Sequence, residues 1–297
     1  MASGGRRPVT DNISTDNVST DNVSTDNVIS ARDVVRRYRR PRRSLTRPAP
    51  AVEALRGVDL GIAYGERFGI VGESGSGKST LIRLLAGLDR PTSGSIRFAG
   101  KEISRASERS LQFLRRDLQM VFQDPMGSLD PRMKVGDIIR EPLVALGHPD
   151  ARGRVAELLD AVGLPAAAAD RYPHQFSGGQ RQRISIARAL SPRPKVLVAD
   201  EPVSALDVSV RAQILNLLMD LVDEFSLTLV FVSHDLSVVR HVCDTVAVMR
   251  GGEIVERGSC ERVYGAPQHP YTKALLAAAP TLEKALAAHR PAKESPR

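Results

Sequence analysis

The feature that most constrains this chain is a glycine-rich octapeptide, which reads Gly72-Glu73-Ser74-Gly75-Ser76-Gly77-Lys78-Ser79 and is followed by Thr80. An apolar run at 67–71 precedes it, and a helical pattern at 79–88, with a stop at Gly87, follows it. Glycines let a backbone fold tightly around phosphates with its N–H groups pointing inward, and a helix N-terminus adds positive potential. Because the flanking strand and helix are both present, the pattern predicts a phosphate-binding loop.

A pair of carboxylates follows a second apolar run. Residues 196–199 are apolar, and Asp200 and Glu201 come directly after them. In a phosphoryl-transfer site the end of such a strand holds an aspartate where Mg²⁺ and its waters sit, while the loop lysine reaches the β- and γ-phosphates. We therefore expect Lys78 on the phosphates, Ser79 and Asp200 on Mg²⁺, and Glu201 beside the attacking water, where it can accept a proton.

The rest of the pattern alternates between strand and helix. Strands are predicted at 55–63, 67–71, 95–98 and 119–122, and apolar β runs return at 195–199, 228–232 and 245–249. Between them, 138–146, 152–162 and 180–190 have helical spacing, so a helical insertion is predicted over about 125–190. Such alternation favours an α/β fold with a mainly parallel sheet covered by helices.

Composition sets further limits. The chain has 297 residues, of which 42% are hydrophobic, and no apolar segment is long enough to cross a bilayer. The first residues are polar and carry no apolar signal core, so we expect a cytosolic protein whose membrane association depends on partners. The two cysteines, Cys243 and Cys260, lack metal-ligand spacing and are expected to be free thiols.

Two N-terminal segments are unusual. Residues 10–28 carry a near-perfect five-residue polar repeat, which we expect to be disordered. The net charge is +8, and residues 32–47 alone hold eight arginines against one aspartate. Such a run can bind nucleic acid or an anionic surface, but a solvated loop is the simpler interpretation and the one we favour.

A third motif lies 23 residues before Asp200, counted from Ser177, and reads Phe176-Ser177-Gly178-Gly179-Gln180. A serine hydroxyl, two glycines and a helix N-terminus make a second anion site. The motif resembles the signature of ATP-binding-cassette (ABC) ATPases, with Phe176 in place of the more usual leucine. The resemblance implies a P-loop NTPase fold of the α/β class, with a RecA-like mainly parallel sheet, an N-terminal antiparallel β subdomain and the signature on an inserted helical subdomain. It also implies a head-to-tail dimer with ATP held between two cassettes.

The resemblance assigns roles to further residues. Gln123 matches the glutamine that senses Mg²⁺ and the γ-phosphate, and His234 the histidine that contacts the γ-phosphate. Asp207 lies in the loop through which the two sites communicate, and Tyr38 matches the aromatic residue that stacks on adenine. The expected cofactors are ATP and Mg²⁺. The catalytic set is Lys78, Gln123, Glu201 and His234, the metal set is Ser79, Gln123 and Asp200, and the nucleotide set is Tyr38, Gly72, Glu73, Ser74, Gly75, Ser76, Gly77, Lys78, Ser79, Thr80, Gln123, Ser177, Gly178, Gly179, Gln180 and Asp207.

Within that family the chain is most similar to the ATPases of oligopeptide and dipeptide importers. Four segments carry the similarity, at 128–133, 171–175, 199–209 and 269–276. The similarity implies two transmembrane permeases, a second ABC ATPase and an extracytoplasmic solute-binding protein as partners, and a peripheral place on the cytoplasmic face of the membrane. The expected domains are a low-complexity tail (1–27), the ATPase domain (28–265) and a C-terminal extension (266–297).

Other functions stay open at this stage. The cassette could serve an importer of another solute, such as nickel or glutathione. A soluble nucleic-acid-associated ABC ATPase is a second alternative, supported only by the arginine run and a basic pI. A weakly active partner subunit is the third, and the intact Glu201 and His234 argue against it. We expect no nucleic acid partner and no iron–sulfur cluster, because only Cys260 lies near the C-terminal element.

Overall fold

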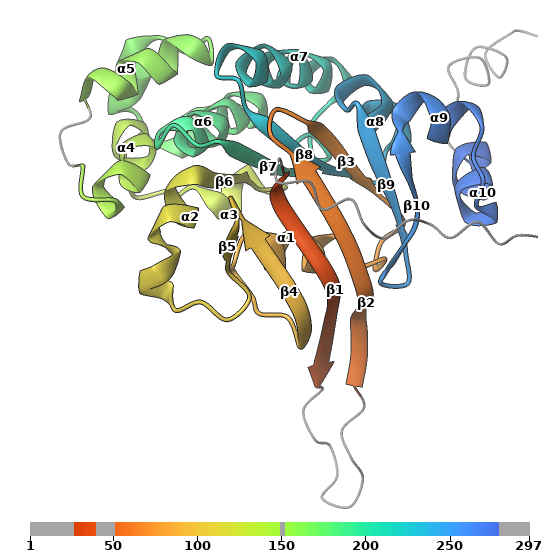
Figure 1. Cartoon of the computed structure of the whole chain (residues 1–297). Coiled ribbons are helices and arrows are strands. Elements are labelled where there is room, and N and C mark those ends of the chain that lie inside the picture. The colour runs from red at the N-terminus through yellow and green to blue at the C-terminus, as the bar shows by residue number, and fades with distance from the viewer. Residues whose placement is uncertain (1–26, 40–50, 149–151, 279–297) are drawn as a thin grey trace, which may run out of the picture.

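The computed structural model describes residues 27–39, 51–148 and 152–278, which form two β-sheets and the helices that cover them (Figure 1). The larger sheet has six strands in the order β10-β9-β3-β8-β7-β6. Strands β9, β3, β8, β7 and β6 run parallel, and β10 pairs antiparallel with β9 at one edge. Its strands are β3 (Arg67–Val71), β6 (Leu118–Val121), β7 (Val196–Asp200), β8 (Thr228–Ser233), β9 (Thr245–Arg250) and β10 (Glu253–Ser259).

The central strands of this sheet are buried on both faces. Every residue of β8 is buried, and so are four of the five residues in each of β3 and β7. A parallel sheet with helices on both faces produces such continuous apolar runs in the sequence. The predicted strands therefore coincide with β3, β7, β8 and β9 to within one residue at each end.

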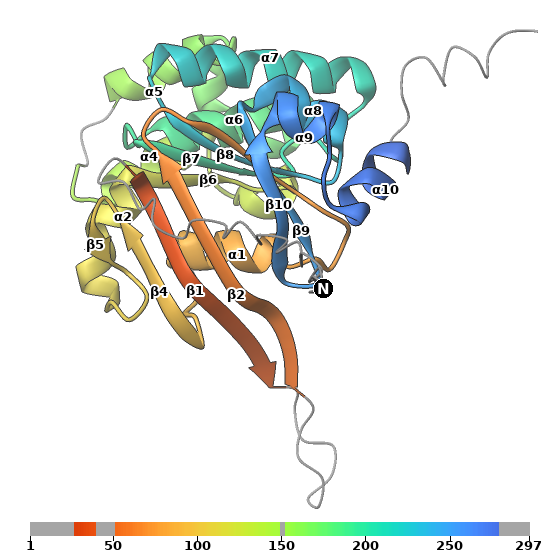
Figure 2. The same ribbon diagram turned by 45° about the vertical axis from the view of Figure 1, so that its right-hand side comes forward.

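A smaller antiparallel sheet lies over one face of the larger one. Its strands β1 (Asn27–Arg39), β2 (Ala51–Ala63), β4 (Ser93–Phe98) and β5 (Lys101–Glu102) have the order β2-β1-β4-β5. Helix α1 (Lys78–Leu85) passes behind β1 and β2 in Figure 2. Its buried residues Leu81, Ile82, Leu84 and Leu85 share one apolar cluster with residues of both sheets. The packing of α1 thus joins the two sheets.

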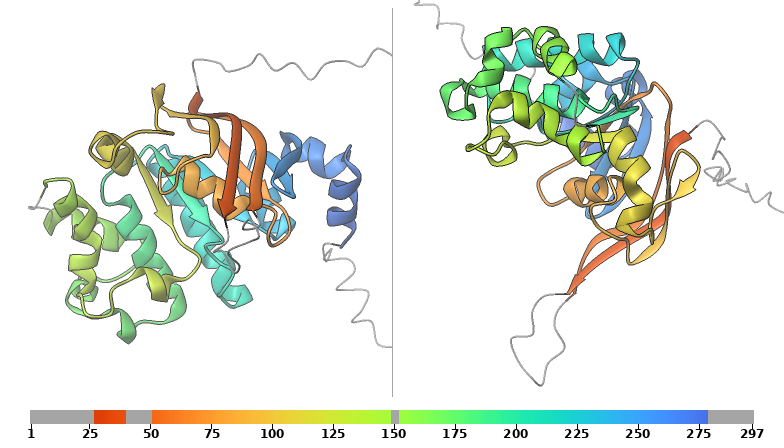
Figure 3. Two further views of the ribbon diagram at one scale, coloured as in Figure 1. Left: turned by 90° about the horizontal axis from the view of Figure 1, so that it is seen from below. Right: turned by 90° about the vertical axis from the view of Figure 1, so that its left-hand side faces the viewer.

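The predicted helical insertion forms a layer at one end of the molecule (Figure 3). It holds α3 (Pro125–Ser128), α4 (Val135–Ala145), α5 (Arg152–Ala161) and α6 (Gly178–Leu190), with the 3₁₀ turns η2 (Ala166–Asp170) and η3 (Pro173–Gln175). Strand β7 then returns the chain to the sheet, and helices α7 (Val208–Glu224) and α8 (Leu236–Val242) follow β7 and β8. Residues of α4 to α8 form one apolar cluster with the sheet face opposite α1.

Several elements were not expected from the sequence. They include β1, the first four residues of β2 (51–54), β5, the turn η1 (Glu108–Leu111), α2 (Gln112–Asp117), β10, α9 (Cys260–Gly265) and α10 (Pro270–Ala278). Figure 1 shows α9 and α10 beside β10, at the end of the molecule away from the helical layer. Both cysteines are free, as expected, and both are buried.

The arginine-rich run contradicts its sequence-based interpretation over the part that the structure describes. Residues 32–39 belong to β1, which pairs with β2 and β4, so they are not a solvated loop. Arg36 lies 2.8 Å from Asp89 and Arg37 lies 2.6 Å from Glu53. Strand pairing satisfies the backbone, and these carboxylates neutralise part of the charge. Residues 40–47, the repeat up to residue 26 and the tail after Ala278 lie outside the described residues.

Candidate active site

The loop that is predicted to bind phosphate leaves β3 and ends where α1 begins. Gly75 and Gly77 have φ values of 81° and 107°, in the left-handed region that favours glycine. The Lys78 ammonium donates to the carbonyl oxygens of Gly72 at 2.6 Å and of Glu73 at 3.0 Å. The loop is therefore closed around its own lysine, with the N-terminus of α1 directly behind it.

Lys78 is the buried charge of the site. Only 6% of its surface is exposed. Burial lowers the pKa of its ammonium below the ordinary value of 10.5, and the charges of Glu201 and Asp200 oppose that shift. The predicted lysine and both predicted carboxylates thus lie within electrostatic range of one another.

Asp200 ends β7, next to β8 in the sheet. Burial first, and then the charge of Glu201, raise the pKa of Asp200 from 3.8 to about 6, although Lys78 and Arg83 act in the opposite direction. The protein therefore stabilises the ionised form of this carboxylate poorly, so a further cation beside it would be favourable.

Glu201 has a constrained backbone. Its φ is 46°, an uncommon value for a residue other than glycine, and its N–H donates to the carbonyl of Val232 at 2.9 Å. Its carboxylate Oε2 lies 3.1 Å from Nδ1 of His234. Asp200 and Val232 are register partners in β7 and β8, so the pairing of these strands brings Glu201 and His234 together. The glutamate side chain is 18% exposed and the histidine 60%, which leaves the histidine open to a ligand.

Two predicted residues lie apart from this cluster. Gln123 is exposed and follows β6, which pairs with β7. Tyr38 is half-buried on β1, where its hydroxyl donates to Asp89 Oδ2 at 2.8 Å and the Arg36 guanidinium lies 4.5 Å from its ring centroid. In the described part of the chain, no hydrogen bond or ion pair joins either residue to Lys78, Asp200 or Glu201. Their roles toward Mg²⁺ and adenine stay predictions.

The signature motif caps helix α6. The hydroxyl of Ser177 accepts the N–H of Gln180 at 3.3 Å, and the Gln180 side-chain oxygen accepts the N–H of Ser177 at 3.0 Å. This capping box fixes the first turn of α6. A Cβ on Gly179 would lie 2.5 Å from the side chain of Val210, so only glycine lets the signature pack this closely on α7. Across the described residues, no hydrogen bond connects Ser177–Gln180 to the loop that holds Lys78.

The residues present fit a nucleoside triphosphate with a divalent cation. The Ser76 hydroxyl is buried and has no hydrogen-bond partner, and a Cβ on Gly75 would meet open space. Ser79 lies exposed in the first turn of α1. A hydroxyl and a carboxylate, from Ser79 and Asp200, are oxygen ligands of the kind that Mg²⁺ takes. The loop N–H groups and Lys78 suit the phosphates.

Comparison with known proteins decides the family. Residues 55–204 match the ABC transporter family, and residues 255–297 match the C-terminal region of oligopeptide/dipeptide transporters.

The chain belongs to the ABC transporter family. It is 51% identical over 257 residues to the di/tripeptide transport ATP-binding protein DppF of Pseudomonas aeruginosa, an alignment that covers 86% of this chain and 79% of that protein. It is also 50% identical over 238 residues to the dipeptide transport ATP-binding protein DppF of Escherichia coli, covering 79% of this chain and 71% of that one. The chain is therefore an ATPase of this family and binds nucleotide.

Solved structures agree with the fold. A dimeric post-hydrolysis state of the ATP-binding cassette MJ0796, bound to ADP and Pi, has a TM-score of 0.69 and 30% identity to this chain. The comparison covers 78% of this chain and 98% of that one. The P-loop NTPase class predicted from the sequence is confirmed.

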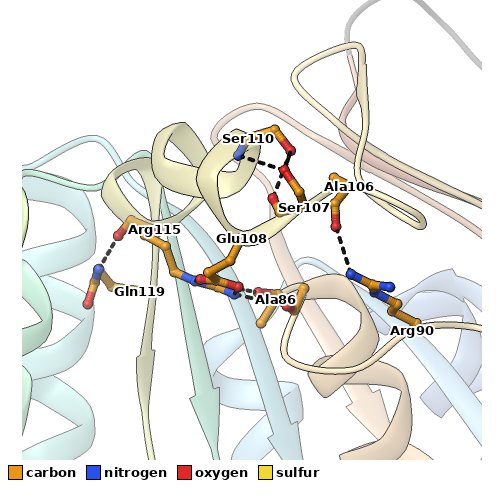
Figure 4. A network of polar contacts seen from close by, with 9 residues as sticks. Ala86, Arg90, Ala106, Ser107, Glu108, Ser110, Arg115 and Gln119 are labelled. Carbon is orange, nitrogen blue, oxygen red and sulfur yellow. Dashed lines mark hydrogen bonds and ion pairs between the residues drawn. The ribbon is translucent and has the colours of Figure 1, made fainter.

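A groove lies between the cassette core and the helical layer. It is lined by Ala86, Leu88, Arg115, Leu118, Gln119, Met120, Phe122, Glu141, Pro142, Ala145 and Arg188. Arg115 is one of these lining residues, and Figure 4 shows its polar contacts. Its guanidinium donates to the carbonyls of Ala86 at 2.6 Å and Gly87 at 2.9 Å and pairs with Glu108. The same figure shows Gln119, on β6, whose side-chain amide donates to the carbonyl oxygen of Arg115. Arg115 therefore links the groove to the end of α1, the helix that begins at Lys78.

The end of α1 explains why the predicted helix was too long. Gly87 has a φ of 62°, and the N–H of Leu88 bonds back to the carbonyl of Arg83 at 2.8 Å. Such a glycine after the last helical residue terminates a helix. The predicted stop at Gly87 is correct, and Leu88 lies outside the helix and is exposed.

Sequence reasoning missed two polar residues near the site. Arg211 of α7 lies 3.7 Å from Asp235, and both line a small pocket with Glu201 and His234. The hydroxyl of Tyr271, in α10, accepts the N–H of Glu73 in the phosphate-binding loop at 3.1 Å. Arg211 gives no sequence signal. Tyr271 belongs to a segment that was noted only as typical of peptide-importer ATPases.

No helix within residues 27–39, 51–148 and 152–278 is both long enough and apolar enough to cross a membrane.

Proposed function

We propose that this chain is the ATP-hydrolysing subunit of an ABC importer and that it energises the uptake of dipeptides and oligopeptides. One observation carries the hydrolytic part: Glu201 lies 3.1 Å from His234 and within electrostatic range of the loop lysine Lys78. The peptide part is supported by the match of residues 255–297 to the C-terminal region of oligopeptide/dipeptide transporters and by relatives that are named as peptide transport ATP-binding proteins.

In this proposal the loop and α1 bind the triphosphate. Lys78 leaves the carbonyls of Gly72 and Glu73 and reaches the β- and γ-phosphates, while the loop N–H groups and the Ser76 hydroxyl cradle their oxygens. Ser79, Asp200 and Gln123 are the residues that would hold Mg²⁺. When bound, Mg²⁺ neutralises charge on the phosphate oxygens.

Glu201 and His234 serve the attacking water. Phosphoryl transfer needs mainly positioning and charge stabilisation, with one group that orients the nucleophile. Glu201 has that place, because its backbone is fixed by Val232 and its carboxylate is held beside the histidine ring. The carboxylate accepts the proton of the water, and His234 contacts the γ-phosphate.

The signature motif acts on a second cassette. Because Ser177–Gln180 caps α6 and packs on α7 rather than joining the loop of its own chain, we infer that it completes the ATP site of a facing subunit. Asp207, at the N-cap of α7, serves communication between the two ATP sites in this proposal. ATP then closes the dimer, and hydrolysis lets it open.

The proposed complex contains two transmembrane permeases, a second ABC ATPase and an extracytoplasmic solute-binding protein. Relatives named as peptide transport ATP-binding proteins support this chain's membership of such a transport complex. The groove beside Arg115 and Phe122 is the surface that we assign to a permease segment, since it adjoins β6 and therefore Gln123. This arrangement would put the protein on the cytoplasmic face of the membrane as a peripheral subunit.

Purification from native membranes in mild detergent tests the proposed assembly. Mass spectrometry of the co-purifying proteins should identify two multi-span permeases and a second cassette ATPase. A stable complex without membrane proteins, or one with nucleic acid, would leave the ATPase chemistry standing and overturn the transport role.

A further inference from the structure

The C-terminal helix α10 touches the phosphate-binding loop. Tyr271 lies in its first turn, and only 6% of the tyrosine surface is exposed. The N–H of Glu73 donates to the Tyr271 hydroxyl at 3.1 Å, across 198 positions of sequence. The Arg250 guanidinium lies 4.9 Å from the centroid of the tyrosine ring and covers it. The contact is therefore held from both the ring and the hydroxyl.

Helix α10 is anchored to the same sheet that carries the loop. The carboxylate of Glu256, on β10, accepts the N–H of Gln268 at 2.8 Å and that of His269 at 3.0 Å. Nδ1 of His269 then accepts the N–H of Tyr271 at 3.1 Å. These bonds satisfy amide groups at the start of α10 and fix the helix to the edge strand. Tyr271 thus approaches the loop from a rigid support.

The first turn of the loop is held on two sides. The Lys78 ammonium donates to the carbonyls of Gly72 and Glu73, while the Tyr271 hydroxyl accepts the N–H of Glu73. A Cβ on Gly72 would lie 2.3 Å from the carbonyl oxygen of Met249, so this turn also packs closely on the end of β9. If Lys78 moves to the phosphates, as proposed above, its hydrogen bond to the Gly72–Glu73 peptide breaks. The hydrogen bond from this peptide to Tyr271 can remain.

We propose that Tyr271 is a positioning residue for ATP binding, and that the C-terminal element of this chain braces the phosphate-binding loop. The proposal rests on the function proposed above, because it assumes that the loop binds ATP. Tyr271 does not contact the phosphates. It accepts the N–H of Glu73 and so fixes the first peptide of the loop, which lets the following N–H groups keep the orientation that phosphates need.

The test is Tyr271→Phe in the full-length chain, which removes the hydroxyl and keeps the buried ring. Loss of one hydrogen bond that organises the loop should weaken Mg-ATP affinity by about 3- to 10-fold in calorimetry. The kcat at saturating ATP should stay within about twofold of wild type, because the hydroxyl does not touch the reacting atoms. Glu256→Gln, which loosens the start of α10, should weaken ATP affinity in the same direction.

Tyr264→Phe is the matched control. Tyr264 lies in the neighbouring helix α9, and its hydroxyl donates to the carbonyl of Leu236 instead of to the loop. That variant should keep ATP affinity within about twofold of wild type. Wild-type affinity in Tyr271→Phe, or an equal loss in both tyrosine variants, would overturn the inference. Failure of the wild-type chain to bind ATP would instead refute the proposed function, so the two failures are distinguishable.

Discussion

Replacement of Asp200 by asparagine should make the nucleotide-free protein more stable while it abolishes ATP hydrolysis. Asp200 is half-buried at the end of β7, and its pKa is raised from 3.8 to about 6 by burial and by the charge of Glu201. At neutral pH the folded protein therefore holds an unfavourable negative charge. Asparagine keeps the size of the side chain and removes that charge, but it cannot serve as an anionic ligand.

The magnitude follows from the shift. A difference of about two pKa units corresponds to about 3 kcal/mol at neutral pH, and solvent screening at this partly exposed site reduces it to about 1–2 kcal/mol. The sign follows from linkage. With a raised pKa, the stabilising contribution of the protonated carboxyl is complete below pH 3.8 and is lost as the pH rises through about 6. The stability difference between Asp200→Asn and wild type should therefore grow from near zero at pH 4 to about 1–2 kcal/mol at pH 7.5.

Urea denaturation of both proteins without nucleotide, at several pH values, measures this difference. Asp220→Asn is the control, because Asp220 is exposed on α7, and its effect should stay within about 0.5 kcal/mol. With Mg-ATP present, the wild type should gain stability and Asp200→Asn should gain much less. An Asp200→Asn protein that is less stable than wild type at pH 7.5, or a difference independent of pH, would refute the electrostatic account of this site.

Three further variants test other parts of the account. Lys78→Ala should weaken ATP affinity at least about tenfold in calorimetry, because a charged donor to the phosphates is lost, and unchanged affinity would exclude that role. Glu201→Gln should still bind ATP and accumulate as a closed dimer in size-exclusion chromatography, with hydrolysis reduced at least about 100-fold, and wild-type turnover would show that another group is the base. Arg115→Ala should lower the free energy of unfolding by about 1–3 kcal/mol, because the carbonyls of Ala86 and Gly87, directly after α1, lose their donor, whereas the exposed Arg109→Ala should change it by less than about 0.5 kcal/mol. Equal stability of the two arginine variants would contradict the proposed link.

Local patterns carried most of the prediction. The loop from Gly72 to Ser79 and the pair Asp200-Glu201 could be predicted because each motif is continuous in sequence and follows an apolar strand. The buried parallel strands were readable for the same reason, since both of their faces are apolar. The contact between Glu201 and His234 is harder to predict from the sequence. It depends on β7 lying beside β8, which the sequence implies only through the fold.

Long-range pairings explain what was missed. The density of arginines predicts a solvated loop, because the run lacks the alternation of apolar and polar residues that indicates a strand. The structure shows instead that β1 pairs with β2 and β4 and that Arg36 and Arg37 have acidic partners. The bond between Tyr271 and Glu73 joins positions 198 residues apart, and no periodicity indicates it. Helix α10 is short, and its sequence indicates only a similarity to peptide-importer ATPases. Its contact with the loop came from the structure.

The most direct test of the central claim is peptide uptake by cells whose only copy of this chain is either wild type or Glu201→Gln. Radiolabelled dipeptides and tripeptides should accumulate in the wild-type cells, and the Glu201→Gln cells should lose nearly all of that accumulation while they keep the assembled complex in the membrane. Equal peptide uptake in the two strains would contradict the claim that ATP hydrolysis by this chain drives peptide import.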